Sequence, residues 1–500
     1  MRFVLPLLLA AAPLLAAEPE PDTTKHVTYV PESVKAEIRE QLKQEVLEQA
    51  KREGWAAPNT VPSWLSRLKP FGDVRVRFER DLFAKGNAAS GDFPDFNAIN
   101  TNKPFDVNFV DPSNERYLNV DQDRTRPRLR AHAGMEAQLG NGFSAMVRVG
   151  TGESPNPGSA NQTVGGDFAR YGVWLDGAVL RYTAFDGGLV ARLGKFEIPF
   201  FNTEMLWAPD VNFDGLAVTV QRGIAFGTAG AFSLYNTPFG FPPEQPEKFA
   251  SRSRWLYAAQ AGVEAAGLKV AIGFFDFDKV EGRVGAACDT NLGFVSCDGD
   301  DSRPPFAQKG NTYIALRTPS DAALALEAAG TVPRYQFFGL ASRFRELTLT
   351  GRYGYALLPR LQAGLEGELV WNAGFKPSQF QDAPALNNRG AIPDGGVIGP
   401  YKGGNHGILG RWFIGTAALA KPGDWLVRVQ YRWVQSDAVL DALNDQDFGL
   451  GGTNLKGYGI DASAALGGGI TFAARWLSAN QIVGPKYGAD VLQIDLAARY

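Results

Sequence analysis

From about residue 71 to residue 500, the chain repeats runs of about ten residues in which every second side chain is apolar. Short turns and long polar loops alternate between these runs. The turns, such as 139–142, 186–188 and 467–469, are rich in glycine, and the longest loop covers about residues 281–344. Weak alternating segments with short connections on one side and long ones on the other are typical of a bacterial outer-membrane β-barrel.

Sixteen such segments can be placed, centred near residues 77, 130, 148, 179, 194, 218, 230, 260, 274, 351, 367, 415, 430, 462, 476 and 495. If the first segment starts in the periplasm, the long loops follow the odd-numbered segments. An even count also brings both chain ends to the same side of the membrane. We therefore predict an all-β protein, a 16-stranded antiparallel transmembrane β-barrel over residues 71–500.

The two faces of these segments differ in polarity. In the second segment, Leu129, Met135 and Leu139 share one face, whereas Arg126 and Glu136 share the other. A charged side chain that faces lipid at mid-depth costs about 2–4 kcal/mol. We therefore expect the charged faces to line a lumen that is wide enough to hold water.

The segment before the barrel is expected to be exported and to remain in the periplasm. Residues 1–17 have the pattern of a signal peptide, with Arg2 before an apolar stretch that ends in Ala16 and Ala17. After it, no run of about 18 apolar residues would form a transmembrane helix. Residues 18–70 are predicted to form a periplasmic linker and helix.

The helix of this linker is predicted over about residues 34–53. Good helix formers surround an apolar stripe in which Val34, Ile38, Leu42 and Val46 recur at every fourth position. The stripe either packs on the barrel mouth or forms a short coiled coil between subunits, and its spacing leaves both alternatives open.

The inward faces define the predicted pore-lining residues. These are Arg75, Arg77, Arg124, Arg126, Arg128, Arg130, Arg181, Arg352, Arg428, Arg432, Arg475, Glu366 and Glu368. From Arg124 to Arg130, guanidinium groups occur at every second position, so they would stack along one strand about 7 Å apart. This run is either a ladder that lowers the entry cost for anions, or a structural net paired with carboxylates of neighbouring strands.

The connection at about residues 200–214 is unusually apolar and aromatic for an exposed loop, and it follows the fifth segment. One interpretation is a constriction loop that folds into the lumen and carries Glu204, Asp210 and Asp214. The other is a lid packed on the rim or on a neighbouring subunit.

Other functional signals are few. Cys288 and Cys297 lie in the longest loop, and export to an oxidising compartment favours a disulfide between them. The three histidines are scattered, and no nucleophile-elbow or zinc-protease motif is present. We predict no enzyme activity, no cofactor and no metal site. The net charge of −3 also argues against binding of nucleic acid.

Several stretches of the sequence resemble one known family. They are residues 27–35, 55–60 and 71–77, followed by 96–100, 120–124 and 212–216. They resemble the “putative porin” family of Gram-negative outer membranes, which is similar in outline to the phosphate- and polyphosphate-selective porins. The resemblance implies a homotrimer with an N-terminal periplasmic coiled coil. It does not transfer phosphate selectivity, because many Glu and Asp residues are also predicted to face inward.

Together these features predict a porin, a water-filled channel for passive diffusion of small hydrophilic solutes and ions, with an anion preference set by lumenal arginines. The expected partners are outer-membrane lipid, lipopolysaccharide, the permeating solutes or anions, and further copies of the chain in a homotrimer. The alternative is a structural barrel that is plugged by its loops and tethered to the cell wall by the periplasmic helix.

Overall fold

The computed structural model of the protein describes residues 37, 39–42, 44–45, 65–102, 116–153, 156–236, 252–285, 287–288, 299–319, 337–379, 385–391 and 399–500. The chain separates into two units, Met1–Ser66 and Arg67–Tyr500. The second unit contains a closed β-barrel, which begins a few residues before the predicted boundary, at Leu68.

Sixteen antiparallel strands form the barrel wall. They are β1 (Leu68–Phe83), β2 (Arg124–Gly140), β3 (Phe143–Gly150), β5 (Trp174–Ala184), β6 (Leu189–Glu197), β7 (Asn212–Arg222), β8 (Ala225–Tyr235), β9 (Arg254–Ala265), β10 (Leu268–Asp278), β15 (Phe344–Leu358), β16 (Leu361–Asn372), β17 (His406–Gly415), β18 (Trp425–Val434), β19 (Leu455–Gly467), β20 (Ile470–Gln481) and β21 (Gly488–Arg499). All sixteen predicted centres fall inside these strands, so the predicted fold class is confirmed.

The barrel closes where the first strand pairs with the last. The register between β1 and β21 runs from Asp73 opposite Arg499 to Phe83 opposite Ala489. Two backbone hydrogen bonds of 3.1 Å between Gly72 and Tyr500 continue this seam. Because the first and last strands pair with each other, the wall has no free edge, and its backbone groups are satisfied within the sheet.

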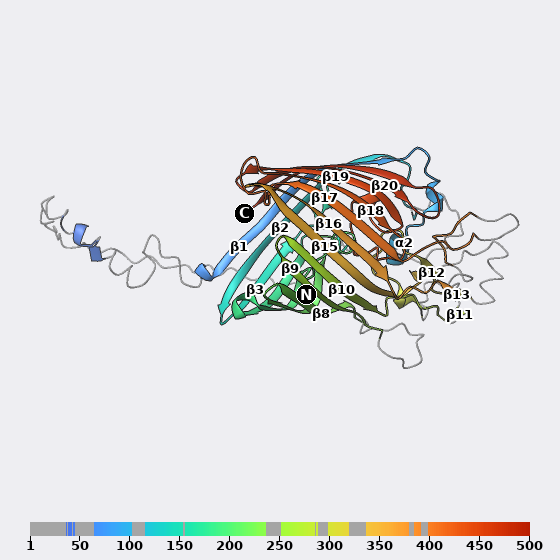
Figure 1. Ribbon diagram of the computed structural model, residues 1–500, viewed down its shortest axis with the longest axis horizontal. Coiled ribbons are helices and arrows are strands. Elements are labelled where there is room, and N and C mark those ends of the chain that lie inside the picture. The colour runs from blue at the N-terminus through green and yellow to red at the C-terminus, as the bar shows by residue number, and fades with distance from the viewer. Residues whose placement is uncertain are drawn as a thin grey trace, which may run out of the picture. The chain divides into compact units, whose positions relative to one another are not determined.

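The smaller elements belong to the long connections. They are the strands β4 (Gln162–Thr163), β11 (Ala287–Cys288), β12 (Tyr313–Ala315), β13 (Thr318–Pro319) and β14 (Phe338–Leu340), the helix α2 (Phe96–Thr101), and the 3-10 turns η1 (Leu65–Arg67), η2 (Ser90–Asp92), η3 (Phe185–Gly187), η4 (Asp300–Ser302), η5 (Pro377–Gln379) and η6 (Phe448–Leu450). Figure 1 shows α2, β11, β12 and β13 at one end of the barrel, whereas the C-terminus lies at the other end. Long and short connections therefore leave opposite ends.

The short connections depend on residues that tolerate a left-handed backbone. Between β2 and β3, Gly140, Asn141 and Gly142 have φ angles of 91°, 51° and 80°. Glycine adopts such angles without steric cost, and asparagine is one of the few other residues that tolerate them. This composition lets the chain reverse within a few residues.

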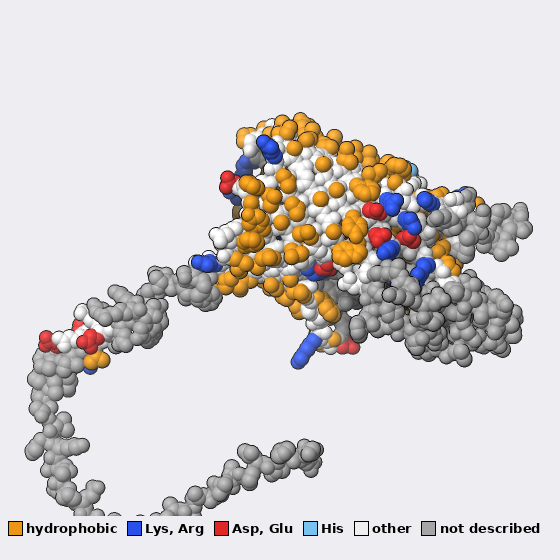
Figure 2. All heavy atoms as spheres, turned by 90° about the horizontal axis from the view of Figure 1, so that it is seen from below, with side chains coloured by type: hydrophobic (Ala, Val, Ile, Leu, Met, Phe, Trp, Pro, Cys, Tyr) orange, Lys and Arg blue, Asp and Glu red, His pale blue; other side chains and the backbone are white. Residues whose placement is uncertain are grey.

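The outer wall is apolar, and the inner wall carries the charges. In β1, Val74 and Val76 are 38% and 55% exposed, whereas the alternating Arg77 and Glu79 are 2% and 1% exposed. Figure 2 shows apolar side chains spread over the outer wall, with charged side chains mostly toward the ends of the strands. This distribution suits a wall that contacts lipid over its middle.

The lumen is partly filled from within. Along β6–β10, inward-facing aromatic residues form one apolar cluster with the β6–β7 connection, including Phe196, Phe200, Trp207, Phe213, Phe232 and Phe275. At the end of the barrel that carries the long loops, residues 299–319 and 435–454, here called the cap loops, bind each other. Asn311 Nδ2 donates to the carbonyls of Ser436 at 2.6 Å and Val439 at 2.8 Å. These contacts narrow the lumen.

Several predictions concern residues that the structure does not describe. Outside the described residues lie the signal peptide, Cys297, the side chain of Cys288 and most of the predicted helix over 34–53. The disulfide and the coiled coil therefore remain predictions. Within the described part of the chain, no helix has the length and hydropathy of a membrane span.

Candidate functional site

The pairing of β1 with β2 creates a belt of like charges at mid-barrel. Arg75 lies directly opposite Arg130, and Arg77 directly opposite Arg128. Like charges in directly opposite cross-strand positions destabilise a sheet unless other groups compensate them. The surroundings of these four arginines therefore decide whether the belt is stable.

The arginine run of β2 is compensated mainly by carboxylates of β1. Arg124 contacts Asp81 at 2.6 Å and Arg126 contacts Glu79 at 2.6 Å. Arg128 also reaches Glu79, at 3.3 Å, and Arg130 binds Asp73 at 2.9 Å. Each guanidinium thus has a carboxylate partner on the neighbouring strand, as expected for the structural net that the sequence left open.

Two loops supply further carboxylates to the belt. Asp210, from the β6–β7 connection, binds Arg130 at 2.9 Å. Asp447, from the cap loop 435–454, binds Arg77 at 3.0 Å, and Asp495 of β21 binds the same guanidinium at 2.7 Å. Burial alone would raise the pKa of Asp447, but Arg77 and Arg475 outweigh it and hold this pKa well below its usual range. Asp447 is therefore ionised at neutral pH.

The β6–β7 connection, residues 198–211, is called the constriction loop below. Its Glu204 forms ion pairs with Arg411 of β17 and, at 3.2 Å, with Arg432 of β18. Burial acts to raise the pKa of Glu204, but the two guanidiniums hold it well below its usual range. The loop thus brings a permanent negative charge to the wall on which these arginines lie.

Apolar and polar anchors hold the constriction loop inside the barrel. The ring of Phe200 lies 5.1 Å from that of Phe275, and Trp207 lies 4.8 Å from Phe213. The hydroxyl of Thr203 donates to the carboxylate of Glu368 at 2.5 Å. Trp207 is 2% exposed, so its side chain is buried as fully as that of a residue in a protein core.

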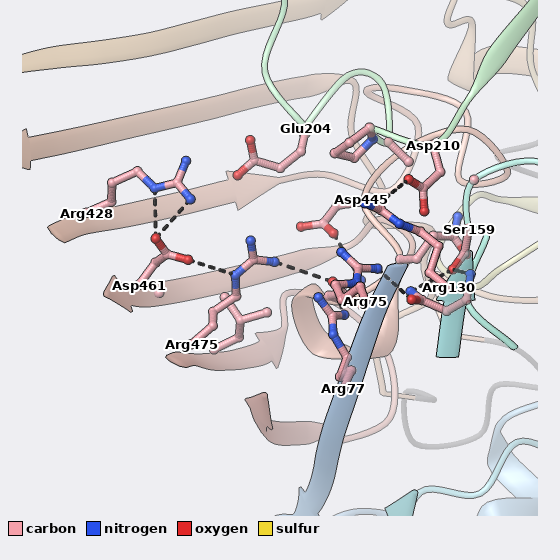
Figure 3. A pocket seen from close by; sticks show the side chains of 18 of the residues that line it. Arg75, Arg77, Arg130, Ser159, Glu204, Asp210, Arg428, Asp445, Asp461 and Arg475 are labelled. Atoms are coloured by element: carbon pink, nitrogen blue, oxygen red, sulfur yellow. Dashed lines mark hydrogen bonds and ion pairs between the residues drawn. The ribbon is translucent and has the colours of Figure 1, made fainter. Parts of the chain in front are cut away.

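These side chains surround a cavity of about 330 Å³ at mid-barrel. Figure 3 shows Arg75, Arg77, Arg428 and Arg475 on the strands of the wall, and Glu204 and Asp210 on the constriction loop. Seven arginines and five carboxylates line the cavity among the described residues: Arg75, Arg77, Arg130, Arg411, Arg428, Arg475, Arg499, Glu204, Asp210, Asp445, Asp447 and Asp461. The described lining therefore has an excess of two positive charges.

Two of these arginines have no carboxylate within 4.0 Å among the described residues, namely Arg75 and Arg499. Arg75 donates instead to the side-chain carbonyl of Asn161 at 2.5 Å, a neutral group, and the nearby Asp495 and Asp210 offset its charge only from a longer distance. The other arginines share carboxylates. For example, Asp461 lies 2.9 Å from Arg428 and 3.4 Å from Arg475. The positive excess is thus concentrated around Arg75 and Arg499.

Apart from Arg181, Arg352 and Asp214, which are described below, the predicted site residues fall into two groups. Arg75, Arg77, Arg130, Arg428, Arg475, Glu204 and Asp210 line the central cavity. The others lie elsewhere in the described lining of the barrel: Arg124, Arg126 and Arg128 pair with β1, Arg432 binds Glu204, and Glu366 binds Arg411 at 2.5 Å. Glu368 anchors the constriction loop.

Three predicted residues lie away from this constriction. Arg181 is 3.8 Å from Glu136, and Arg352 lies 4.9 Å from the ring centroid of Phe413. Asp214 pairs with Lys195 at 3.1 Å, on β7 rather than in the constriction loop. None of the three belongs to the described lining of the central cavity.

The sequence did not predict Arg411, Arg499 or the loop carboxylates Asp445 and Asp447 as site residues. Arg411 is the only charged residue on the inward face of β17, so alternation alone gave a weak signal there. The two aspartates come from a loop, where no periodicity indicates which side chains turn inward. Within the described ranges, no group of three or more His, Cys, Asp or Glu residues is arranged to hold a metal ion.

Comparison with known proteins identifies the family. Residues 8–500 match a family model described as putative porin. No curated protein sequence matches the chain. Among solved structures, OprB of Pseudomonas putida is 12% identical, with 87% of this chain and 95% of that chain covered and a TM-score of 0.44.

Two further structures show the same range of similarity. A triple mutant of the Rhodopseudomonas blastica porin is 9% identical, covering 87% of this chain and 100% of that chain with a TM-score of 0.35. OmpT of Vibrio cholerae with loop L8 deleted is 8% identical, with the same coverage and a TM-score of 0.39. These similarities are weak and carry no inference about solute or assembly. The family match spans nearly the whole chain, so the chain belongs to the putative porin family and forms a channel of the bacterial outer membrane.

Proposed function

We propose that this porin is a passive channel rather than an enzyme, and that it passes small hydrophilic solutes and ions with a mild preference for anions. The observation that carries the preference is the excess of two positive charges in the described lining of the central cavity. The arginine run of β2 contributes little to it, because its charges are paired with Asp73, Glu79 and Asp81. The preference is instead assigned to Arg75 and Arg499.

The test is the reversal potential of the purified protein in a planar bilayer under a KCl gradient. The wild-type potential is expected to have the sign of anion flow. Arg75→Gln should move the reversal potential toward zero, because it removes a positive charge that has no ion-pair partner among the described residues. Arg360→Gln is the matched control, since Arg360 is an exposed turn residue paired with Asp424 at 2.7 Å. A cation-selective wild type, or equal shifts in both variants, would overturn the assignment.

We further infer a homotrimer with a periplasmic coiled coil at residues 34–53, and contacts of the rim with lipopolysaccharide. The apolar stripe of this segment and the family resemblance support the assembly. Stepwise openings in groups of three in the same bilayer recording would be expected for a trimer. The homotrimer would be contradicted if the channels opened singly and the protein still migrated as a monomer after chemical crosslinking.

One observation favours the alternative of a plugged structural barrel. The cap loops are joined by buried hydrogen bonds, such as that of 2.6 Å from the hydroxyl of Thr312 to the carboxylate of Asp437. Such contacts resist displacement by a solute. A folded, heat-modifiable sample that conducts no ions but binds peptidoglycan would support this alternative.

A further inference from the structure

A second cavity, which shares no described lining residue with the central cavity, lies at the end of the barrel with the long loops. Its volume is about 240 Å³, and its walls come from the constriction loop, from β7–β9 and from the cap loops. Most of the lining is apolar and includes Trp207, Phe213, Phe232, Leu256, Phe306 and Leu443. Since an apolar cavity of about 150 Å³ already holds benzene, this one has room for a solute with a single aromatic ring.

A buried donor on this lining has no partner. The indole Nε1 of Trp207 makes no hydrogen bond to any described residue, although Trp207 is 2% exposed. A buried N–H without an acceptor costs about 1–3 kcal/mol. Apolar packing alone does not explain why this donor is buried without an acceptor. An oxygen of a bound solute would satisfy it.

A buried positive charge lines the same cavity. Arg254 is 4% exposed, and its guanidinium donates to two neutral groups, the carbonyls of Arg303 at 3.1 Å and of Asp301. Among the described residues, no carboxylate lies within 4.0 Å of it. Because a guanidinium has five N–H donors, Arg254 retains capacity for an anionic acceptor.

The carboxylates of the lining are already engaged. Asp214 pairs with Lys195 at 3.1 Å, and Asp441 accepts backbone N–H groups of Gln308 and Asn311, each at 3.4 Å. They therefore do not pair with Arg254, whose guanidinium lies 4.8 Å from the ring centroid of Tyr235 and has no ion-pair partner among the described residues. The cavity thus combines aromatic walls, the indole N–H of Trp207 without an acceptor, and a guanidinium without an ion-pair partner among the described residues.

We propose that this side cavity binds a small aromatic carboxylate, with its ring against the apolar walls and its oxygens toward Arg254 and the indole N–H. This solute class rests on the proposed channel function, because the solute must reach the cavity through the lumen. Binding itself is a separate property and can be measured without transport.

The test is binding of 4-fluorobenzoate to the full-length protein in detergent, followed by fluorine NMR, with fluorobenzene as the uncharged comparison. Saturable binding of 4-fluorobenzoate is expected. Ala442→Leu, which adds bulk to the lining, should abolish it. Trp207→Phe keeps the aromatic packing but removes the N–H, and should weaken binding about fivefold, the value of one hydrogen bond. Trp412→Phe, on the outer wall, is the matched control and should leave it unchanged.

Arg254→Gln tests the contribution of the guanidinium charge separately from the shape of the cavity. It should weaken binding of 4-fluorobenzoate and leave binding of fluorobenzene unchanged. A signal that does not saturate, or that is equal in Ala442→Leu and the wild type, reflects partition into detergent and would overturn the proposal. Ion conductance of the same preparations separates the failure of this proposal from the failure of the proposed channel function. Conduction without saturable binding would contradict only the proposed solute site in the side cavity. Binding without conduction would contradict only the proposed channel function.

Discussion

Single carboxylates set the charge of the constriction, and Glu204 is the one with the most direct effect. Substituting Glu204→Gln removes one negative charge from the cavity but leaves partners for both guanidiniums, since Arg411 keeps Glu366 and Arg432 keeps Asp445. The protein should fold, and its reversal potential in a KCl gradient should shift further toward anion selectivity.

The control for this substitution is Asp214→Asn, because Asp214 is 55% exposed and lies outside the described lining of the central cavity. An equal shift in the control would contradict the prediction. The pH dependence gives a second check. The pKa of Glu204 is held below its usual range, so its stabilising contribution is present above about pH 4 and is lost only as the pH falls below that value. Its effect on selectivity should therefore stay constant between about pH 5 and 8.

The sequence predicted the residues of the wall better than those of the loops. Strand alternation fixes which side chains share a face, so Arg75, Arg428 and Arg475 were predicted to face the lumen. Alternation does not give the partners of a charge. The pairing of Arg126 with Glu79 depends on the register of β1 against β2, and that of Arg77 with Asp447 depends on how a loop folds. Such long-range contacts leave no local pattern in the sequence.

At the level of elements, the constriction loop is predicted to control the width of the channel. Phe200→Ala removes a ring that is 6% exposed and lies 5.1 Å from Phe275, at a cost of about 3–5 kcal/mol. The loop should loosen from the wall, so single-channel conductance and current noise should both rise. Phe274→Ala, on the outer face of β10, is the control and should change neither. An unchanged conductance in Phe200→Ala would show that the loop does not limit the current.

The cap loops are predicted to respond to pH. Burial raises the pKa of Asp441 to about 7, and the nearby Asp437 adds to the shift. The folded state then holds a proton that the unfolded state releases above about pH 4, so stability should fall as the pH rises from about 4 to about 7 and level off above. Thermal unfolding measured across this range should show the slope, and Asp441→Asn should flatten it. A slope that persists in Asp441→Asn would assign it to another group.

Alternation of apolar and polar side chains predicted the barrel strands but not the smaller elements of the loops. The sixteen barrel strands were visible because each has one apolar and one polar face. Even so, the predicted centre at 415 falls on the last residue of β17, because its inward face carries little charge. The short strands β12 and β14 and the helix α2 were not predicted. They are stabilised by tertiary contacts, such as the stacking of Phe96 on Tyr313 with ring centroids 4.3 Å apart, rather than by local pattern.

For the whole molecule, the proposed anion preference should depend on ionic strength. The charges that set it face a cavity of about 330 Å³ that admits water and salt, so mobile ions screen them. The Debye length falls from about 10 Å at 0.1 M to about 3 Å at 1 M salt. Reversal potentials measured at a fixed KCl ratio should therefore show the mild anion preference at low salt and almost none at molar salt. Arg75→Gln keeps Arg499, so it should show a smaller anion preference than the wild type at low salt and the same near-absence of preference at molar salt. A preference that is independent of salt would instead indicate a buried anion site, where protein atoms exclude the screening ions.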